Sequence, residues 1–279
     1  MAPLVWLASY PKSGNTWARA LLANYRHDGS DPVDINNLGG LIASHREQFD
    51  EWLSVEASDL SAVEIARYRR RWYTLLAADA HEPVIMKVHD GFHDANGEAL
   101  FTPGPEMRVI CIVRHPCAVA VSLAHHAGWS VDRSIEAMRT GFRSSKMGDS
   151  LHDQLEQWVP PWSTHVSDWM SSMPSAIVIR YEDMIARPLD ETRRLIGAVV
   201  DVVDANRLQR AVAFSSFAEL QAQEARRGFV ERPPSAPAFF RQGATDAWRR
   251  DLTEAQHAEL ISDHGTMMAR LGYAGESRT

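Results

Sequence analysis

Short apolar runs alternate along the chain with longer segments in which apolar residues recur at helical spacing. The runs at 5–9, 84–88, 109–113 and 176–180 are brief, rich in β-branched residues and bounded by polar residues or proline, which predicts buried strands. Amphipathic segments predict helices at 15–25, 61–78, 116–127, 130–140, 151–158, 161–173, 188–200, 206–214 and 253–271. Strands separated by helices predict an α/β protein with a central parallel sheet flanked by helices on both faces.

Local signals support several of these boundaries. Ser61 and Glu64 form the S-x-x-E pattern of a capping box. The pair Pro160-Pro161 predicts a break in the chain before the next helix. Segment 228–238 is rich in proline and polar residues, and we expect a flap between the α/β body and the C-terminal part. Three prolines suit the first turn of a helix: Pro116, Pro161 and Pro188.

Composition then limits the class of protein. The 279 residues, 45% of them hydrophobic, can bury one large core, and we expect a single domain over residues 1–279. The net charge of −7 does not favour a protein that coats nucleic acid or an anionic membrane, so any anion site must be local. The RYRRRW run at 67–72 is therefore interpreted as a solvated helix face.

Two further features concern the compartment. Cys111 and Cys117 are too few for a disulfide framework, and we expect free thiols. No apolar stretch reaches the roughly 18 residues of a membrane span, and the N-terminus lacks the basic start and cleavage site of a signal peptide. We therefore expect a cytoplasmic protein with no membrane partner.

The candidate chemistry begins directly after the first predicted strand, in the stretch YPKSGNTW at 10–17. Gly14 allows a tight turn, and the backbone NH groups of residues 13–16 open the helix that follows. Lys12 adds a full positive charge, so the stretch predicts a P-loop-like cradle for a phosphate or sulfate. It is not a Walker A loop, because the opening glycine is absent and the lysine precedes Gly14. An ordinary strand-to-helix turn with a surface lysine would give the same short pattern.

Two other predicted strands end in residues that suit the same chemistry. Lys87 and His89 are two residues apart, so their side chains leave the strand end on the same face. A histidine can take a proton from a hydroxyl group at neutral pH, because its ordinary pKa is about 6.5. Arg114 ends the strand at 109–113, and Ser122 follows about two helical turns later, which predicts a clamp for a second phosphate. Each residue taken alone is equally consistent with a structural role.

Together these segments resemble the sulfotransferases that use 3′-phosphoadenosine 5′-phosphosulfate (PAPS) as sulfuryl donor. The stretch at 10–17 is similar to their YPKSGTTW loop, Lys87-x-His89 to their K-T-H segment, and Arg114 with Ser122 to their 3′-phosphate motif. RYEDM at 180–184 and FFRQGATDAWRRDLT at 239–253 resemble two further family segments. All five segments follow the family's order, and that order is far more specific than any one of them.

The resemblance implies a role for each matching residue. The 5′-phosphosulfate would be held by Lys12, Ser13, Gly14, Asn15 and Thr16, and the 3′-phosphate by Arg114, Ser122, Arg241, Gln242 and Gly243. The adenine would lie against Trp17, Tyr181 and Phe217. His89 would be the catalytic base, while Lys12 and Lys87 would stabilise charge at the transferring group. The donor would leave as adenosine 3′,5′-bisphosphate (PAP).

Some positions depart from the family pattern. Gln242 stands where the family usually has lysine, which removes one cation from the 3′-phosphate site. Asp246-Ala247 replaces Gly-Asp before the tryptophan of that segment. The segment through which some family members dimerise is matched poorly at 249–258, so the oligomeric state stays open.

We expect no metal ion. Sulfuryl transfer should resemble phosphoryl transfer, but the sulfuryl group carries less negative charge, so lysines can replace the metal. His125 and His126 are adjacent on a predicted helix and point about 100° apart, so they do not easily share one ion. A contact of either histidine with the acceptor stays open.

The sequence thus predicts an enzyme that moves a sulfuryl group from PAPS to a hydroxyl of a small molecule by in-line transfer. The alternatives are a P-loop nucleotide kinase and a protein that binds PAPS or PAP without turnover. The acceptor would lie among segments 35–52, 89–93, 125–129 and 228–238, whose mixture of aromatic, histidine and apolar residues selects no single acceptor.

Overall fold

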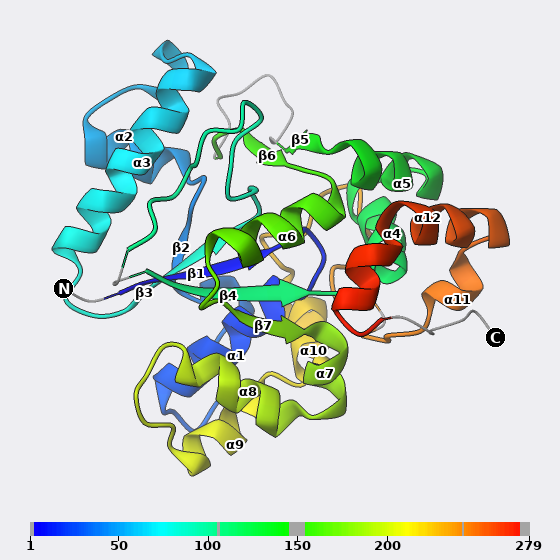
Figure 1. The fold of residues 1–279 in the computed structure, drawn as a ribbon. Helices are drawn as coiled ribbons and strands as arrows, with labels where there is room; N and C mark the ends of the chain where they lie inside the picture. Colours follow the sequence, from blue (N-terminus) through cyan, green and yellow to red (C-terminus); the bar gives the residue numbers. More distant parts are fainter. Residues whose placement is uncertain (1–2, 105–106, 145–153, 242, 274–279) are drawn as a thin grey trace.

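A five-stranded parallel sheet in the order β2-β3-β1-β4-β7 forms the centre of the molecule (Figure 1). The computed structural model describes residues 3–104, 107–144, 154–241 and 243–273. The strands are β1 (Leu4–Ser9), β2 (Leu41–Ile42), β3 (Val84–Val88), β4 (Met107–Val113) and β7 (Ile177–Arg180). The four predicted strands are confirmed, and β2 is too short for its pattern to be recognised.

Helices cover both faces of this sheet, as predicted (Figure 1). The helices are α1 (Asn15–His27), α2 (Arg46–Leu53), α3 (Ala62–Asp79), α4 (Pro116–Ala127), α5 (Val131–Thr140), α6 (Trp162–Ser172), α7 (Tyr181–Ala186), α8 (Pro188–Gly197), α9 (Ala205–Phe214), α10 (Phe217–Arg227), α11 (Trp248–Asp251) and α12 (Glu254–Arg270). Short 3₁₀ turns lie at Ile35–Asn37 and Ala57–Asp59.

Alternate residues of β1 face two different apolar layers. Trp6 and Ala8 pack in one cluster with tryptophans of α3 and α6. Val5 and Leu7 pack in a second cluster with leucines of α1, α8 and α9. Because both faces of a central parallel strand are buried, the run is apolar throughout, which explains why it is recognisable in the sequence.

Most of the predicted cap signals are confirmed. Ser61 and Glu64 form the predicted capping box, and Pro116 and Pro188 lie in the first turns of α4 and α8. Pro161 is instead the N-cap residue of α6. The helix α10 was not predicted, although Ser216 caps it by accepting a hydrogen bond from the NH of Glu219.

The helix predicted at 151–158 is wrong. Residues 151–153 lie outside the described residues, and Gln157–Val159 form β6, which pairs antiparallel with β5 (Phe142–Ser144). Apolar residues at 151, 155 and 158 mimic helical spacing. Tertiary contacts override that pattern, because the NH of Trp158 donates to Asp90 Oδ1 at 3.1 Å and its carbonyl accepts from the NH of Gly91 at 3.0 Å.

The solvated face predicted for the run at 67–72 is also partly wrong. Arg69 is only 2% exposed and forms a bidentate ion pair with the buried Asp90, at 3.1 and 2.7 Å. Its Nε donates to the hydroxyl of Tyr73 at 2.9 Å. The pair ties α3 to the residue that directly follows His89.

Cys111 and Cys117 are free and buried, as predicted. In the part of the chain that the structure describes, no helix combines the length and the apolar character needed to cross a bilayer.

The sheet order brings three strand ends together. β1 pairs with both β3 and β4, so the residues after these strands meet at one edge of the sheet. In open parallel sheets this carboxyl edge is where ligands bind.

Candidate active site

The loop between β1 and α1 forms a tight turn. Lys12 and Gly14 have φ angles of 70° and 105°, and the NH of Ser13 donates to the carbonyl of Tyr10 at 3.2 Å. Gly14 is the N-cap residue of α1 and has no side chain to cap the helix. A Cβ atom here would lie 2.7 Å from Cδ2 of Tyr181, so the turn needs glycine for its φ angle and for this close approach. The first NH groups of α1 can therefore face an anion.

Several buried polar atoms have no hydrogen-bond partner among the described residues, and two of them are donors beside the start of α1. They are the hydroxyl of Ser13 and Nε of Arg114. Asn15 and Thr16, which begin α1, are also buried. The amide of Asn15 donates to the carbonyl of Leu7 at 2.9 Å and thereby ties the helix start to β1. Because buried polar groups are normally paired, the two unpaired donors fit a ligand that supplies acceptor oxygens.

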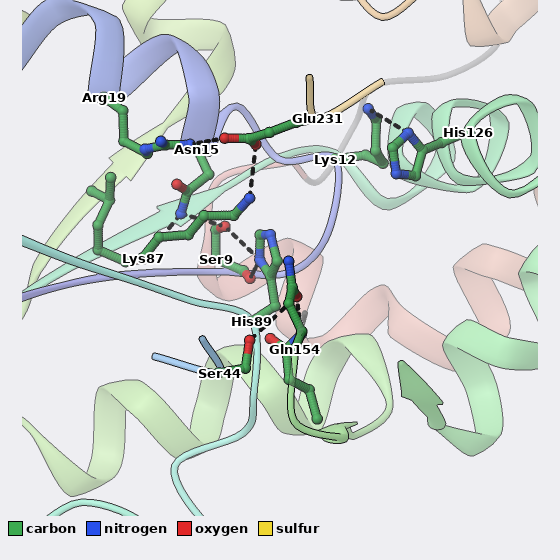
Figure 2. A network of polar contacts seen from close by, with 12 residues as sticks. Ser9, Lys12, Asn15, Arg19, Ser44, Lys87, His89, His126, Gln154 and Glu231 are labelled. Atoms are coloured by element: carbon green, nitrogen blue, oxygen red, sulfur yellow. Dashed lines mark hydrogen bonds and ion pairs between the residues drawn. The ribbon is translucent and has the colours of Figure 1, made fainter. Parts of the chain in front are cut away.

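The side chain of Lys12 reaches across the loop toward α4. Its ammonium lies 3.9 Å from the ring centre of Phe239. The same ammonium lies 3.3 Å from Nδ1 of His126 (Figure 2). Burial lowers the pKa of Lys12 to about 7, and the charges of Arg114 and Lys87 act in the same direction. An anion bound in the loop would favour the charged amine again.

His89 lies directly after β3, against the end of β1 (Figure 2). Its Nδ1 donates to the carbonyl of Ser9 at 2.8 Å, and because a carbonyl only accepts, the lone pair of the ring is on Nε2. Burial lowers the pKa of His89 to about 3, and the charge of Lys87 adds to the effect. The ring is therefore neutral near pH 7.

Lys87 is held by an ion pair that the sequence did not reveal. Its ammonium donates to Oε2 of Glu231 at 2.9 Å, and Oε1 of Glu231 accepts from Arg19 of α1 at 2.5 Å (Figure 2). Burial raises the pKa of Glu231, but the charges of Lys87 and Arg19 outweigh it and lower the pKa to about 2. The Glu231 carboxylate is therefore ionised between two cations.

Arg114 connects the anion loop to the C-terminal part of the chain. One terminal nitrogen donates to the carbonyl of Lys12 at 3.0 Å, and the other to the carbonyl of Ala244 at 3.3 Å. The guanidinium also stacks over the ring of Tyr181 at 4.3 Å. The predicted phosphate ligand thus lies beside the anion loop, with its Nε unpaired among the described residues.

The residues predicted to contact adenine form two close contacts near the start of α1 and at Gly243. The rings of Trp17 and Tyr181 lie 5.6 Å apart at 70°, and the Trp17 indole donates to the carbonyl of Ser215 at 2.8 Å. A Cβ at Gly243, whose φ is 61°, would lie 2.7 Å from Cδ2 of Phe217. The structure therefore brings Trp17 to Tyr181 and Phe217 to Gly243.

The other predicted ligands of the 3′-phosphate are less closely gathered. Arg241 contacts Nε2 of His125 at 2.8 Å, while Ser122 is half-buried on α4. No hydrogen bond joins Arg114 to Ser122 or Arg241 in the described part of the chain. Gln242 lies outside the described residues.

Within the described ranges, no group of three or more histidine, cysteine or acidic side chains is placed to hold a metal ion. His125 faces Arg241, whereas His126 faces Lys12, so the two adjacent histidines have different partners.

Three residues of this site received no individual role from the sequence, namely Arg19, Glu231 and Phe239, although Glu231 lies in the segment 228–238 that was expected to line the acceptor. Arg19 and Glu231 are separated by more than 200 positions, and no short pattern links them. Phe239 does lie in the segment that carried the resemblance, and that position is the only sequence signal for it.

The fold and the site define a class, namely α/β proteins with an anion loop after the first strand and cationic side chains at the same sheet edge. Within that class, the sulfotransferase domain family matches residues 2–272. The chain therefore belongs to the family of PAPS-dependent sulfotransferases, which confirms the resemblance found in the sequence.

Individual relatives agree with this assignment. Flavonol 3-sulfotransferase of Flaveria bidentis is 22% identical over 280 residues, which cover 90% of this chain and 77% of that protein. Cytosolic sulfotransferase 1 of Arabidopsis thaliana is 23% identical over 263 residues, which cover 88% and 73%. The crystal structure of retinol dehydratase with retinol and PAP has a TM-score of 0.64 at 17% identity, covers 96% of this chain and 82% of that one, and shares the fold.

Proposed function

We propose that the protein transfers a sulfuryl group from PAPS to a hydroxyl group of a small molecule, with His89 as general base. The observation that carries this proposal is the hydrogen bond from Nδ1 of His89 to the Ser9 carbonyl, which leaves the lone pair on Nε2. That neutral base lies at the same sheet edge as the cations of Lys12 and Lys87. A base and cations at one edge suit a reaction that removes a proton while it moves an anionic group.

The donor would be bound as the family resemblance implies. Residues 12–16 would hold the 5′-phosphosulfate, and the unpaired donors of Ser13 and Arg114 support an anion at this position. Trp17, Tyr181 and Phe217 would enclose the adenine. Arg114, Ser122, Arg241, Gln242 and Gly243 would hold the 3′-phosphate.

In the proposed reaction, the acceptor oxygen attacks sulfur in line with the leaving phosphate oxygen. Nε2 of His89 takes the hydroxyl proton while the new sulfur–oxygen bond forms. The bond from sulfur to the phosphate oxygen breaks, and PAP leaves. Lys12 and Lys87 stabilise the charge on the transferring group and on the leaving oxygen.

A base whose pKa is about 3 is weak, and the bound donor changes this. The negative charge of PAPS next to the ring would favour the imidazolium and raise the pKa of His89. The base would therefore become effective only in the complex that contains the donor.

The acceptor class and the compartment are also proposals. The relative from Flaveria bidentis is named for sulfation of a flavonol, and the relative from Arabidopsis thaliana is named as cytosolic. Phenols and alcohols both offer the hydroxyl that the proposed base requires.

The test is calorimetric titration with PAP, without metal, of the wild type and the variants Lys12→Ala and Arg114→Ala. The wild type should bind, and both substitutions should weaken binding at least tenfold. Arg71→Ala, which removes an exposed arginine of α3, is the matched control and should bind as the wild type does. Absence of PAP binding by folded wild type would contradict the proposal.

The two alternatives give different results. A nucleotide kinase would bind ATP with magnesium in preference to PAP. A protein that binds without turnover would bind PAP but show no transfer from PAPS to any acceptor in a panel of phenols and alcohols.

A further inference from the structure

Glu231 lies between two cations from different elements, Arg19 of α1 and Lys87 of β3. One carboxylate oxygen lies 2.9 Å from the ammonium of Lys87, and the other lies 2.5 Å from a terminal nitrogen of Arg19. The side chains of Arg19, Lys87 and Glu231 are 12%, 13% and 20% exposed. The bridge is therefore largely shielded from water, where ion pairs are less screened than at the surface.

The backbone around Glu231 is fixed by hydrogen bonds on both sides. The NH of Val230 donates to Oδ1 of Asn36 at 2.9 Å, and the NH of Arg232 donates to the carbonyl of Phe229 at 3.0 Å. Further along the same segment, the hydroxyl of Ser235 donates to the carbonyl of His126 at 3.0 Å. The carboxylate is thus presented to Lys87 from an anchored segment.

The surroundings of Lys87 disfavour a charged amine. Burial lowers the pKa of Lys87, and the charge of Arg19 from α1 acts in the same direction, whereas Glu231 opposes both. Lys12 lies close enough for the two lysines to repel each other. The two histidines that face this cluster, from the end of β3 and from α4, are His89 and His126, and both have a pKa lowered to about 3 and carry no charge near pH 7.

We propose that Glu231 is a positioning residue for sulfuryl transfer: bridged to Arg19, its carboxylate holds the Lys87 ammonium charged and fixed beside His89. The proposal rests on the proposed function, because it takes Lys87 as a group that stabilises the transferring sulfuryl. Glu231 acts through Lys87 and need not touch the donor or the acceptor.

The chain offers a direct measurement, because it contains only three lysines: Lys12, Lys87 and Lys146. Acylation by an amine-directed reagent requires the neutral amine, so the rate of modification of each lysine against pH reports its ionisation. Peptide mass spectrometry separates the three sites. This experiment uses the protein without donor and needs no acceptor.

In Glu231→Gln, the pH at which Lys87 is half-maximally reactive should fall by roughly 1 to 3 units, because an opposite charge in contact has been removed. Glu231→Asp keeps the charge on a shorter side chain and should give a midpoint between the two. Asp34→Asn is the matched control. It also changes a carboxylate to an amide, but in a surface ion pair, which Asp34 forms with Arg227 at 2.6 Å. Its Lys87 midpoint should equal that of the wild type.

An unchanged Lys87 midpoint in Glu231→Gln would overturn the proposal, and so would an equal shift in Asp34→Asn. If Glu231→Gln does not fold, Glu231→Asp decides, and a midpoint identical to the wild type then counts against the bridge. With an acceptor found by the PAPS screen, the alkaline limb of kcat/KM should move to lower pH in the same variants. If the wild type does not bind PAP, the proposed function is rejected, but the titration of Lys87 can still be measured.

Discussion

Nδ1 of His89 and the carbonyl oxygen of Ser9 lie 2.8 Å apart, across the neighbouring strands β1 and β3. A backbone carbonyl, and not a carboxylate, therefore orients the ring. The carbonyl fixes the tautomer but adds no full negative charge, so it does little to stabilise an imidazolium. The backbone oxygen of His89 is fixed as well, because it accepts from Nε2 of His165 at 3.2 Å.

Replacing His89 tests its role as the base. His89→Ala should lower the rate of transfer from PAPS by about 10² to 10⁴-fold, the range expected for loss of a general base. Affinity for PAP should change little, because His89 is not among the residues proposed to hold the donor. His81→Ala, at an exposed position before β3, is the control and should keep full activity. Normal turnover by His89→Ala would exclude this residue as the base.

The ionisation of His89 can be followed without an acceptor. Because burial and Lys87 lower its pKa to about 3, the ring should stay neutral as the pH falls from 7 to 5. Protonation, and the loss of a functional base, should begin only below that range. Nitrogen NMR of labelled histidines would show this, with the signal missing in His89→Gln giving the assignment. A resonance that titrates near pH 6.5 would contradict the prediction.

Lys12 should take up a proton when PAP binds. Its pKa is about 7 in the free protein, so at pH 8 most of the amine is neutral, and a bound phosphate should restore the charge. Apparent affinity should therefore fall as the pH rises above 7. Calorimetry at pH 8 in two buffers of different ionisation enthalpy measures the uptake. Lys12→Arg should bind without uptake, because arginine stays charged, and equal enthalpies for the wild type in both buffers would refute the coupling.

Gly14→Ala should damage the anion loop. The new methyl group would meet Tyr181 at 2.7 Å at a φ of 105°, which is costly for any residue with a side chain, so we expect a loss of roughly 1 to 3 kcal/mol in unfolding free energy and weaker PAP binding. Gly197→Ala is the matched control, because nothing lies within 4 Å of its added methyl group. Denaturant unfolding of both variants makes the comparison, and equal stability would show that the loop tolerates the side chain.

Asp90→Asn should be strongly destabilising. The change leaves the Arg69 guanidinium buried and unpaired, and loss of one partner of such a pair typically costs about 3 to 5 kcal/mol. Glu136→Gln breaks an exposed pair with Arg139 and should leave stability unchanged within the error of the measurement. Thermal unfolding distinguishes the two. A mild effect of Asp90→Asn would mean that water or another group reaches Arg69.

Features that depend on local sequence patterns could be predicted, whereas features that depend on distant contacts could not. The four main strands were predictable because strands buried on both faces are continuously apolar, whereas β2 is too short to show a pattern and 151–158 imitates a helix. The anion loop was predictable because it needs residues of special type close together in sequence, Lys12 and Gly14. The roles of single residues came from the family resemblance, and the single domain over 1–279 stays a prediction.

The ion bridge was not predictable. Arg19 and Glu231 meet only because α1 and the segment after α10 pack together, and no short sequence pattern links the two residues. The ion pair between Arg69 and Asp90 was not predictable either, because the run at 67–72 has the composition of a charged surface segment although Arg69 is buried.

The proposed donor site draws on both halves of the polypeptide, since the carbonyl of Ala244 accepts from Arg114 and the ring of Phe239 lies against Lys12 in the loop that begins at residue 10. Contacts so distant in sequence are slow to form, because long loops must close first. On the ribosome, a nascent chain that has not reached residue 244 still lacks part of this enclosure. Nucleotide capture should therefore be among the last properties that the growing protein acquires, and it can serve as a reporter of completed synthesis and folding.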